Sequence, residues 1–196
     1  MATKRNTPTK KQVKRAFIEI VNEKGLERLS MSDIARRADI NRGTLYLHYT
    51  DKYDLLKKLE DEVLNHLANI LFTTLPKDGV SAPGDLVSDD AILEALRYVR
   101  EEYAFFKALV GPGGDAEFVE RIKEMIGRSI FDEIRQSGLQ QANDPDVPEE
   151  YVRDIVLGGV MAAITRWLKT GTHESAESIA RLISRTKDVA LENLLA

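Results

Sequence analysis

Apolar residues recur at intervals of three and four positions through most of the chain, and no stretch shows a sustained alternation of apolar and polar residues. This spacing gathers apolar side chains on one face of a helix, whereas a strand would alternate. The pattern therefore predicts an all-α protein. The expected helices are 9–24, a short one from 30, 42–49, 52–75, 89–110, 115–137, 149–170, and a last one from 174 or 175 to 195. Loops or turns rich in Gly, Pro, Ser or Asn are expected at 76–88, 111–114 and 143–148.

The stretch 30–52 carries several helix starts in close succession. Ser30 is a good N-cap, and Asp33 has the spacing to bond back to the Ser30 amide as in a capping box. Asn41 suits the cap of the next helix, and Asp51 with Asp54 repeats the spacing of the box. Caps this close together specify two short helices, a tight turn and the start of a further helix. Such an arrangement is typical of a helix-turn-helix.

The second short helix, expected at 42–49, has one inward and one outward face. Leu45 and Tyr49 lie four positions apart and point inward together. The outer and flanking positions carry hydroxyl, guanidinium and imidazole groups and one apolar side chain, from Arg42, Thr44, Tyr46, Leu47 and His48. The DNA major groove offers hydrogen-bond acceptors to such polar groups and thymine methyls to an exposed Leu. A surface helix without any ligand has the same periodicity, and this alternative stays open.

The segment 9–59 resembles the N-terminal domain of the TetR family of transcriptional regulators. The matching residues are Gly25-Leu26, the run from Ser30 to Ala35, the run from Gly43 to Tyr46, His48-Tyr49, Asp51-Lys52 and Leu55-Leu56. Two positions depart from the family pattern, which usually has Gly where this chain has Asp39 and Phe where it has Tyr49. Because Asp tolerates left-handed backbone geometry better than most residues, we expect the turn at Asp39 to survive.

The resemblance implies a DNA-binding domain over 1–51, with the start of a linking helix to about 58, and an effector-binding and dimerisation domain over 52–196. The expected DNA contacts are Ser32, Arg36, Asn41, Arg42, Gly43, Thr44, Tyr46, Leu47, His48 and Lys52. Base edges are assigned to Arg42, Thr44, Tyr46 and Leu47, and phosphates to Ser32, His48 and Lys52. Lys52 begins a helix, where a bound phosphate is favoured.

The charge distribution supports a nucleic-acid partner although the net charge is −4. Residues 1–58 hold 14 Lys and Arg against 7 Asp and Glu, a balance of +7. Residues 59–196 hold the other 14 basic residues against 25 acidic ones, a balance of −11. A basic segment on an acidic body neutralises phosphates at one end only. We therefore expect double-stranded DNA to bind the N-terminal part.

The last two expected helices predict a homodimer. Residues 155–164 are apolar on nearly all sides, so a helix there must be covered on most of its surface. Packed across a two-fold axis, two such helices per subunit form a four-helix interface, and the TetR resemblance supports this arrangement. The expected interface residues are Ile155, Gly158, Gly159, Ala162, Ala163, Ile179, Leu182, Ile183 and Val189. An ordinary core within one chain is the alternative.

An aromatic-rich middle region indicates a pocket for a small, apolar effector, whose identity the sequence leaves open. The candidate pocket residues are Leu67, Leu71, Tyr98, Tyr103, Phe106, Phe131 and Trp167. By the family resemblance, the effector tilts the linking helix and releases a palindromic operator, which makes the protein a repressor. The rival interpretation is a dimeric DNA-binding adaptor or co-regulator that a protein partner controls and whose middle core is filled.

Other functions find little support in the sequence. The absence of Cys excludes disulfides and Cys-based metal or redox sites. Glu62 and His66 have the spacing to share a metal ion, but such a pair is more often a solvated helix face. No G-x-S-x-G, H-E-x-x-H or Walker motif occurs, so neither an enzyme nor a cofactor is expected. The first residues are polar and the longest apolar run, 155–164, is too short to span a bilayer, so we expect a cytoplasmic protein without a membrane partner.

Overall fold

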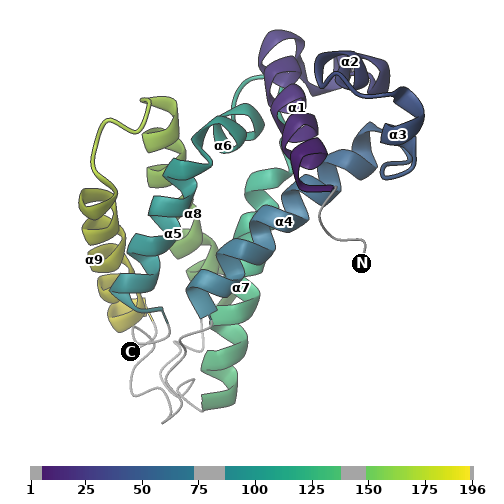
Figure 1. The fold of residues 1–196 in the computed structure, drawn as a ribbon. Coiled ribbons are helices and arrows are strands. Elements are labelled where there is room, and N and C mark those ends of the chain that lie inside the picture. Colours follow the sequence, from purple (N-terminus) through teal and green to yellow (C-terminus); the bar gives the residue numbers. More distant parts are fainter. Residues whose placement is uncertain (1–5, 73–86, 138–148, 195–196) are drawn as a thin grey trace. The chain divides into compact units, whose positions relative to one another are not determined.

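The computed structural model describes residues 6–72, 87–137 and 149–194, and the regular elements within these ranges are all helices (Figure 1). In chain order they are α1 (Asn6–Arg28), α2 (Met31–Arg37), α3 (Arg42–Tyr46), α4 (Lys52–Phe72), α5 (Asp89–Glu101), α6 (Tyr103–Val110), α7 (Phe118–Ser137), α8 (Glu149–Lys169) and α9 (Ala176–Leu194). The predicted all-α class is confirmed. The chain divides into two compact units, the first made of Met1–Val63 and Ala104–Phe118, the second of Leu64–Tyr103 and Val119–Ala196.

The first unit packs α1, α2, α3 and the start of α4 around an apolar core. Phe17 of α1, Ile34 of α2 and Leu45 of α3 are among its most deeply buried side chains. Leu26, near the end of α1, and Leu29, between α1 and α2, are buried as well. Each short helix packs one face on this core and exposes the other.

α6 adds an aromatic cluster to the same unit. The ring of Phe106 lies 6.4 Å from that of Phe105 and 5.8 Å from that of Phe118, measured between centroids. Such tilted and edge-to-face pairs are the favourable geometries for aromatic rings. The ammonium of Lys14, on α1, lies 4.8 Å from the Phe105 ring centroid. A segment distant in sequence therefore helps to complete the unit that holds the helix-turn-helix.

Two glycines join α1 to the turn that follows α6. Gly25 interrupts α1 with φ 80° and ψ 163°, so the regular helix ends where the sequence predicts, although the assigned element continues to Arg28. The Leu26 amide donates a hydrogen bond of 2.8 Å to the Gly113 carbonyl. A Cβ on Gly25 would lie 3.3 Å from that carbonyl oxygen, and Gly113 itself has φ 82°. Both positions therefore favour Gly, for backbone conformation and for close approach.

The prediction of one helix over 89–110 is wrong, because the chain breaks at Glu102. This residue has φ −90° and ψ 19°, and its amide donates to the Tyr98 carbonyl at 2.9 Å to end α5. The apolar pattern runs on through the break, but its two halves serve different cores. Leu96 is buried in the second unit and Phe106 in the first. The break at Glu102 separates the two halves, and each buries its apolar face within its own unit.

The second unit packs α9 against both α5 and α8, and polar groups secure these contacts. Arg97 of α5 forms an ion pair with Glu177 of α9 at 2.9 Å. The buried Lys187 donates to the Val87 carbonyl at 2.9 Å, which ties α9 to the segment before α5. The indole N–H of Trp167, in α8, donates to a carbonyl of the following turn at 2.9 Å.

Other boundaries differ from the predictions by a few residues. α3 ends at Tyr46 instead of 49, yet the Tyr49 amide still donates to the Leu45 carbonyl at 3.0 Å and its side chain is buried. α7 begins at Phe118 instead of 115, because the Asp115 carboxylate caps the preceding turn by accepting from the Glu117 amide at 2.9 Å. The predicted helix end at 75 and the predicted loop 143–148 lie outside the described residues.

Candidate nucleic-acid interface

Local capping sets the α2–turn–α3 geometry. The Ser30 hydroxyl accepts from the Asp33 amide at 3.2 Å at the start of α2, and Asn41 Oδ1 accepts from the Gly43 amide at 2.7 Å at the start of α3. Asp39, between the helices, has φ 52° in the left-handed region, so the turn is kept without the Gly usual in the family. The predicted caps at Ser30 and Asn41 are confirmed.

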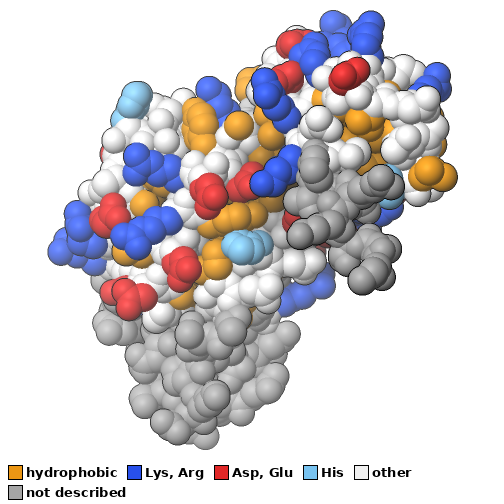
Figure 2. Space-filling model, viewed as in Figure 1, with side chains coloured by type: hydrophobic (Ala, Val, Ile, Leu, Met, Phe, Trp, Pro, Cys, Tyr) orange, Lys and Arg blue, Asp and Glu red, His pale blue; other side chains and the backbone are white. Residues whose placement is uncertain are grey.

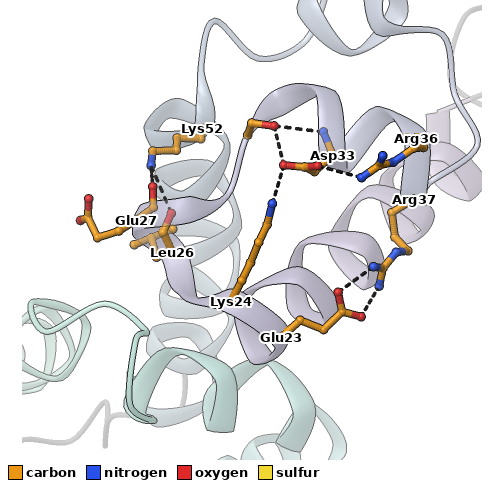
Figure 3. A network of polar contacts seen from close by, with 9 residues as sticks. Glu23, Lys24, Leu26, Glu27, Asp33, Arg36, Arg37 and Lys52 are labelled. Carbon is orange, nitrogen blue, oxygen red and sulfur yellow. Dashed lines mark hydrogen bonds and ion pairs between the residues drawn. The ribbon is translucent and has the colours of Figure 1, made fainter.

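Asp33 differs from the capping box that the sequence predicts. Its carboxylate accepts hydrogen bonds from Lys24 Nζ at 2.7 Å, Arg36 Nη2 at 2.9 Å and the Ser30 hydroxyl (Figure 3). The bond from Lys24, followed by that from Ser30, lowers the pKa of Asp33 from 3.8 to about 2. The carboxylate thus ties α2 to the end of α1, which local spacing did not predict.

Arg37 makes a second tie between α1 and α2. Its guanidinium donates two hydrogen bonds of 2.7 Å to the Glu23 carboxylate and a third of 3.2 Å to Glu19 (Figure 3 shows the Glu23 pair). This hydrogen bonding is the main cause that lowers the pKa of Glu23. Paired geometry of this kind fixes orientation as well as adding stability. Arg37 therefore positions the helix-turn-helix.

α3 presents its predicted face to solvent. Leu45 is 1% exposed and holds the helix on the core, whereas Leu47 is 81% exposed. The predicted contact residues at 41–44 and 46–48, together with Ser32 and Arg36, are likewise exposed. The Arg42 guanidinium lies 5.4 Å from the Tyr46 ring centroid, and its Nη2 donates to the Tyr46 hydroxyl at 3.3 Å. The structure thus brings two predicted base-reading residues together on one face.

The start of α4 is fixed by a cap with a shifted register. Asp51 Oδ1 accepts from the Asp54 amide at 2.8 Å as predicted, but Asp54 reaches back to the Thr50 amide at 2.9 Å. Lys52 is partly buried, and its ammonium donates to the carbonyls of Leu26 and Glu27 at 3.1 and 2.7 Å (Figure 3). Lys52 therefore closes the end of α1, and its phosphate contact stays a prediction.

Lys58 is a residue of this region that the sequence reading missed. Its ammonium donates to the His48 carbonyl at 2.8 Å and to Asp54 Oδ2 at 2.9 Å, and it lies 5.4 Å from the Tyr49 ring centroid. These contacts hold the turn after α3 against α4. The four-residue spacing of Asp54 and Lys58 is typical of a helical ion pair and is the signal that could have drawn attention to Lys58, whereas no local pattern predicts the bond to His48.

The surface of the first unit is rich in basic side chains, and Figure 2 shows Lys and Arg gathered over α1 and α2. Some of these charges are already paired, such as Lys10 with Glu62 at 2.7 Å. Arg42 makes no ion pair with any residue that the structure describes. Its charge, on the exposed face of α3, is therefore available to a phosphate or a guanine edge.

The candidate effector residues are distributed over both units. Phe106 is buried in the first unit, and Leu67, Leu71 and Trp167 are buried in the second. Tyr98 is partly buried and borders a surface hollow of about 480 Å³, where its ring lies 4.2 Å from that of His66. Half of the residues that line the hollow are charged residues of α5, unlike the predicted apolar pocket. Tyr103 is partly buried, and the side chain of Phe131 lies outside the described residues.

The candidate dimer residues separate into exposed and buried sets. Ile155 and Leu182 are 65% and 53% exposed, and Gly159 and Ala162 are exposed as well. Gly158, Ala163 and Ile179 are partly exposed, and the side chain of Val189 lies outside the described residues. Ile183 differs from the prediction of an interface residue. It is buried in its own chain, because that side of α9 packs on the rest of the second unit.

Comparison with known proteins identifies the family to which this chain belongs. Residues 16–59 match the model of bacterial regulatory proteins of the tetR family, and residues 88–188, half of the chain, match that of a transcriptional regulator C-terminal region. The chain belongs to the TetR family. The N-terminal match contains the helix-turn-helix, the C-terminal match covers the C-terminal region of a transcriptional regulator, and the relatives are regulators, not enzymes. Within the described ranges, no helix is long and apolar enough to cross a membrane.

Individual relatives agree with this placement. An uncharacterised HTH-type regulator of Bacillus subtilis, YxbF, is 27% identical over 105 residues, which span 52% of this chain but only 26% of that protein. A fatty acid metabolism regulator of the same organism is 23% identical over 168 residues, 84% of this chain and 86% of its own. The solved structure of FadR from Bacillus subtilis with stearoyl-CoA has a TM-score of 0.64 at 16% identity, covering 92% and 97% of the two chains. This last likeness shows the shared fold.

Proposed function

We propose that this TetR-family protein is a homodimeric repressor that binds a palindromic operator through α3 and is released by a small effector with a long apolar chain. The exposed, capped face of α3 carries the DNA part of the proposal, since Leu45 fixes the helix while Arg42, Tyr46 and Leu47 point outward. Two such helices on a palindrome multiply a modest half-site affinity.

Arg42 and Lys52 are assigned different roles in operator binding. Arg42→Ala costs about 1–3 kcal/mol on the operator and relaxes its sequence preference, because a base contact is lost. Lys52→Ala weakens binding to all duplexes alike and reduces the salt dependence, because a phosphate contact is lost. Fluorescence anisotropy on the operator and on a scrambled duplex, over a range of salt, measures both effects.

Two controls make these measurements decisive. Arg128→Ala removes an exposed positive charge from α7, in the second unit, and should leave DNA affinity unchanged. Thermal unfolding of Lys52→Ala is required because the ammonium also bonds the Leu26 and Glu27 carbonyls. Equal losses on both duplexes for the Arg42 and Lys52 variants would refute the assigned roles.

The effector class is supported by the relatives. The chain is similar along most of its length to a fatty acid metabolism regulator, and it shares its fold with a FadR bound to stearoyl-CoA. An acyl chain also fits the predicted apolar sensor. The effector has only to favour the releasing conformation by about 1–3 kcal/mol to give useful control.

Operator release tests the effector. Stearoyl-CoA should dissociate the operator complex in the anisotropy assay, whereas free coenzyme A at the same concentration should not. A chain-length series should show affinity falling as methylenes are removed, since each buried methylene contributes about 0.8 kcal/mol. Complete indifference to acyl thioesters and free fatty acids would favour the adaptor, which a protein partner controls.

A further inference from the structure

The C-terminal end of α3 is closed by a side chain from another helix. The last backbone carbonyls of a helix have no intrahelical amide to bond, and a basic side chain close to the helix end often bonds them instead. The last turn of α3, which ends at Tyr46, contains no basic residue. Lys58 of α4 supplies the missing group, because its ammonium donates to the His48 carbonyl at 2.8 Å, two residues past the end of α3.

Lys58 also holds the next two residues of this turn. Asp54 Oδ2 accepts hydrogen bonds from Lys58 Nζ and from the Thr50 amide, both at 2.9 Å. The hydrogen bond from Lys58 is the main cause that lowers the pKa of Asp54. The ammonium lies 5.4 Å from the ring centroid of Tyr49, whose side chain is buried. Lys58 and Asp54 therefore fix residues 48–50 against α4.

The turn that Lys58 fixes carries two of the predicted DNA contacts. Leu47 is 81% exposed, and the side chain of His48 is exposed as well. The start of α3, where Arg42 lies, is fixed separately by the cap from Asn41. Removal of the Lys58 ammonium should therefore displace Leu47 and His48 but leave Arg42 in place.

We propose that Lys58 is a positioning residue for operator binding, which sets the backbone after α3 so that Leu47 and His48 reach the DNA, and that its ammonium does not contact the duplex. The inference rests on the proposed role of α3 in operator binding. Its consequence concerns specificity, because discrimination at the base pairs that meet Leu47 then depends on a side chain of α4 that touches no base.

A neighbouring lysine gives a matched control. Lys57, one position earlier on α4, also forms an ion pair with a carboxylate four residues away, Asp61, at 3.2 Å. Among the residues that the structure describes, Lys57 makes no hydrogen bond with the turn after α3. Lys57→Met and Lys58→Met therefore remove the same charge from the same helix, but only Lys58→Met releases the turn.

Operator affinity tests the proposal. The probe is a fluorescent duplex that the wild-type protein selects from a random-sequence library, and anisotropy measures its binding. Lys58→Met should weaken binding by about tenfold, the effect of losing one hydrogen bond from a charged group. Lys57→Met should weaken it by less than about twofold, as expected for an exposed ion pair. The salt dependence of the affinity should be the same for both variants, because neither ammonium bonds a phosphate.

Double-mutant cycles distinguish positioning from direct contact. In a Leu47→Ala/His48→Ala background, Lys58→Met should cost less than about threefold, because the side chains that Lys58 positions are already absent. In an Arg42→Ala background, the cost should stay at about tenfold, because a separate cap fixes the start of α3.

A folding check accompanies the series. Lys58→Met should remain folded, because the Lys58 side chain is 51% exposed and water can bond the His48 carbonyl in its place. Urea unfolding of every variant establishes conditions under which all are folded, and the affinities are compared under those conditions. Any loss of affinity then reports on the DNA contacts and not on the folded fraction.

The outcomes separate this inference from the proposed function. A cost of Lys58→Met that is the same in all backgrounds would overturn the positioning role, and a salt slope about one unit lower than that of Lys57→Met would then identify a direct phosphate contact. Equally small effects of the two lysine variants would also overturn it, but DNA binding through α3 would stand if Arg42→Ala and Leu47→Ala still lose affinity. If neither of these α3 variants weakens binding, the proposed function itself fails.

Discussion

In the first unit, polar side chains cap the helices and connect them to one another, whereas in the second unit the described residues leave one face of α8 uncovered. In the first, the caps of α2, α3 and α4 have partners, and Lys24, Arg37, Lys52 and Lys58 join elements together. In the second, α8 exposes Ile155 near Gly158 and Gly159, where an added Cβ would meet no described atom within 4 Å. The difference agrees with the proposed roles, in which the first unit binds DNA and the exposed face of α8 contacts a second protein surface.

This contrast predicts different consequences for changes in the two regions. Interior changes in the first unit act on folding, and through folding on DNA binding. Changes on the exposed face of α8 act on assembly and leave the stability of the single chain almost unchanged. Matched substitutions in the two kinds of environment test the contrast.

The largest effect is expected inside the first unit. Leu45→Ala, at a position 1% exposed, should lower the free energy of unfolding by about 2–5 kcal/mol by removing buried atoms and leaving a cavity. Leu47→Ala changes the same residue type two positions away, where the side chain is 81% exposed, and should alter stability by less than about 0.5 kcal/mol. Urea unfolding measures both, and operator affinity should fall for Leu47→Ala despite its normal stability.

A pair of glycines compares the two units directly. Gly25→Ala should destabilise the first unit by about 1–3 kcal/mol, because φ is 80° and the new Cβ approaches the Gly113 carbonyl. Gly159→Ala should raise the stability of the single chain by up to about 1 kcal/mol, because Ala is the better helix former and the site is open. The same change should weaken dimerisation. Urea unfolding measures the stability of both variants, and sedimentation velocity measures their dimerisation. If both substitutions destabilise the chain equally, the contrast between the two units is wrong.

Helix caps should show similar stability effects in the two units but different functional ones. Asn41→Ala and Ser88→Ala each remove a side chain that accepts a hydrogen bond from a backbone amide, with donor–acceptor distances of 2.7 and 3.2 Å respectively. Each should cost about 1 kcal/mol in thermal or chemical unfolding. Only Asn41→Ala should also reduce operator affinity, because its cap orients α3. A comparable loss of affinity for Ser88→Ala would argue against that reason.

The smallest effect concerns pH. The pKa of Asp33 lies at about 2 in the folded chain, below its ordinary value of 3.8. Its ionised form therefore stabilises the fold above about pH 4, and this contribution disappears as the pH falls towards 2. Because the site is partly open to solvent, the contribution should be about 1 kcal/mol. When the free energy of unfolding is measured from pH 6 to pH 2, the Asp33→Asn variant should be less stable than the wild type near pH 6. Its stability should also depend less on pH. If the variant and the wild type have the same pH dependence, ionised Asp33 does not stabilise the fold.

The sequence alone determined the features that depend on neighbours a few residues away. The caps at Ser30, Asn41 and Asp51 involve partners two or three positions along, and the inward pair Leu45 and Tyr49 follows from helical spacing. These contacts are short-range, so a linear pattern is enough to specify them. The same reasoning gave the helical class, the break at Gly25 and the composite motif that the TetR family shares.

Only the tertiary structure decided the features that depend on distant segments. The helix break at Glu102, the place of Phe106 in the first unit and the burial of Ile183 each result from competition between packing surfaces, which an unbroken apolar pattern cannot resolve. Lys52 bonds carbonyls 25 and 26 positions away, and Gly113 approaches Gly25. The local sequence determines which face of a helix is apolar, but the tertiary structure determines which residues that face packs against.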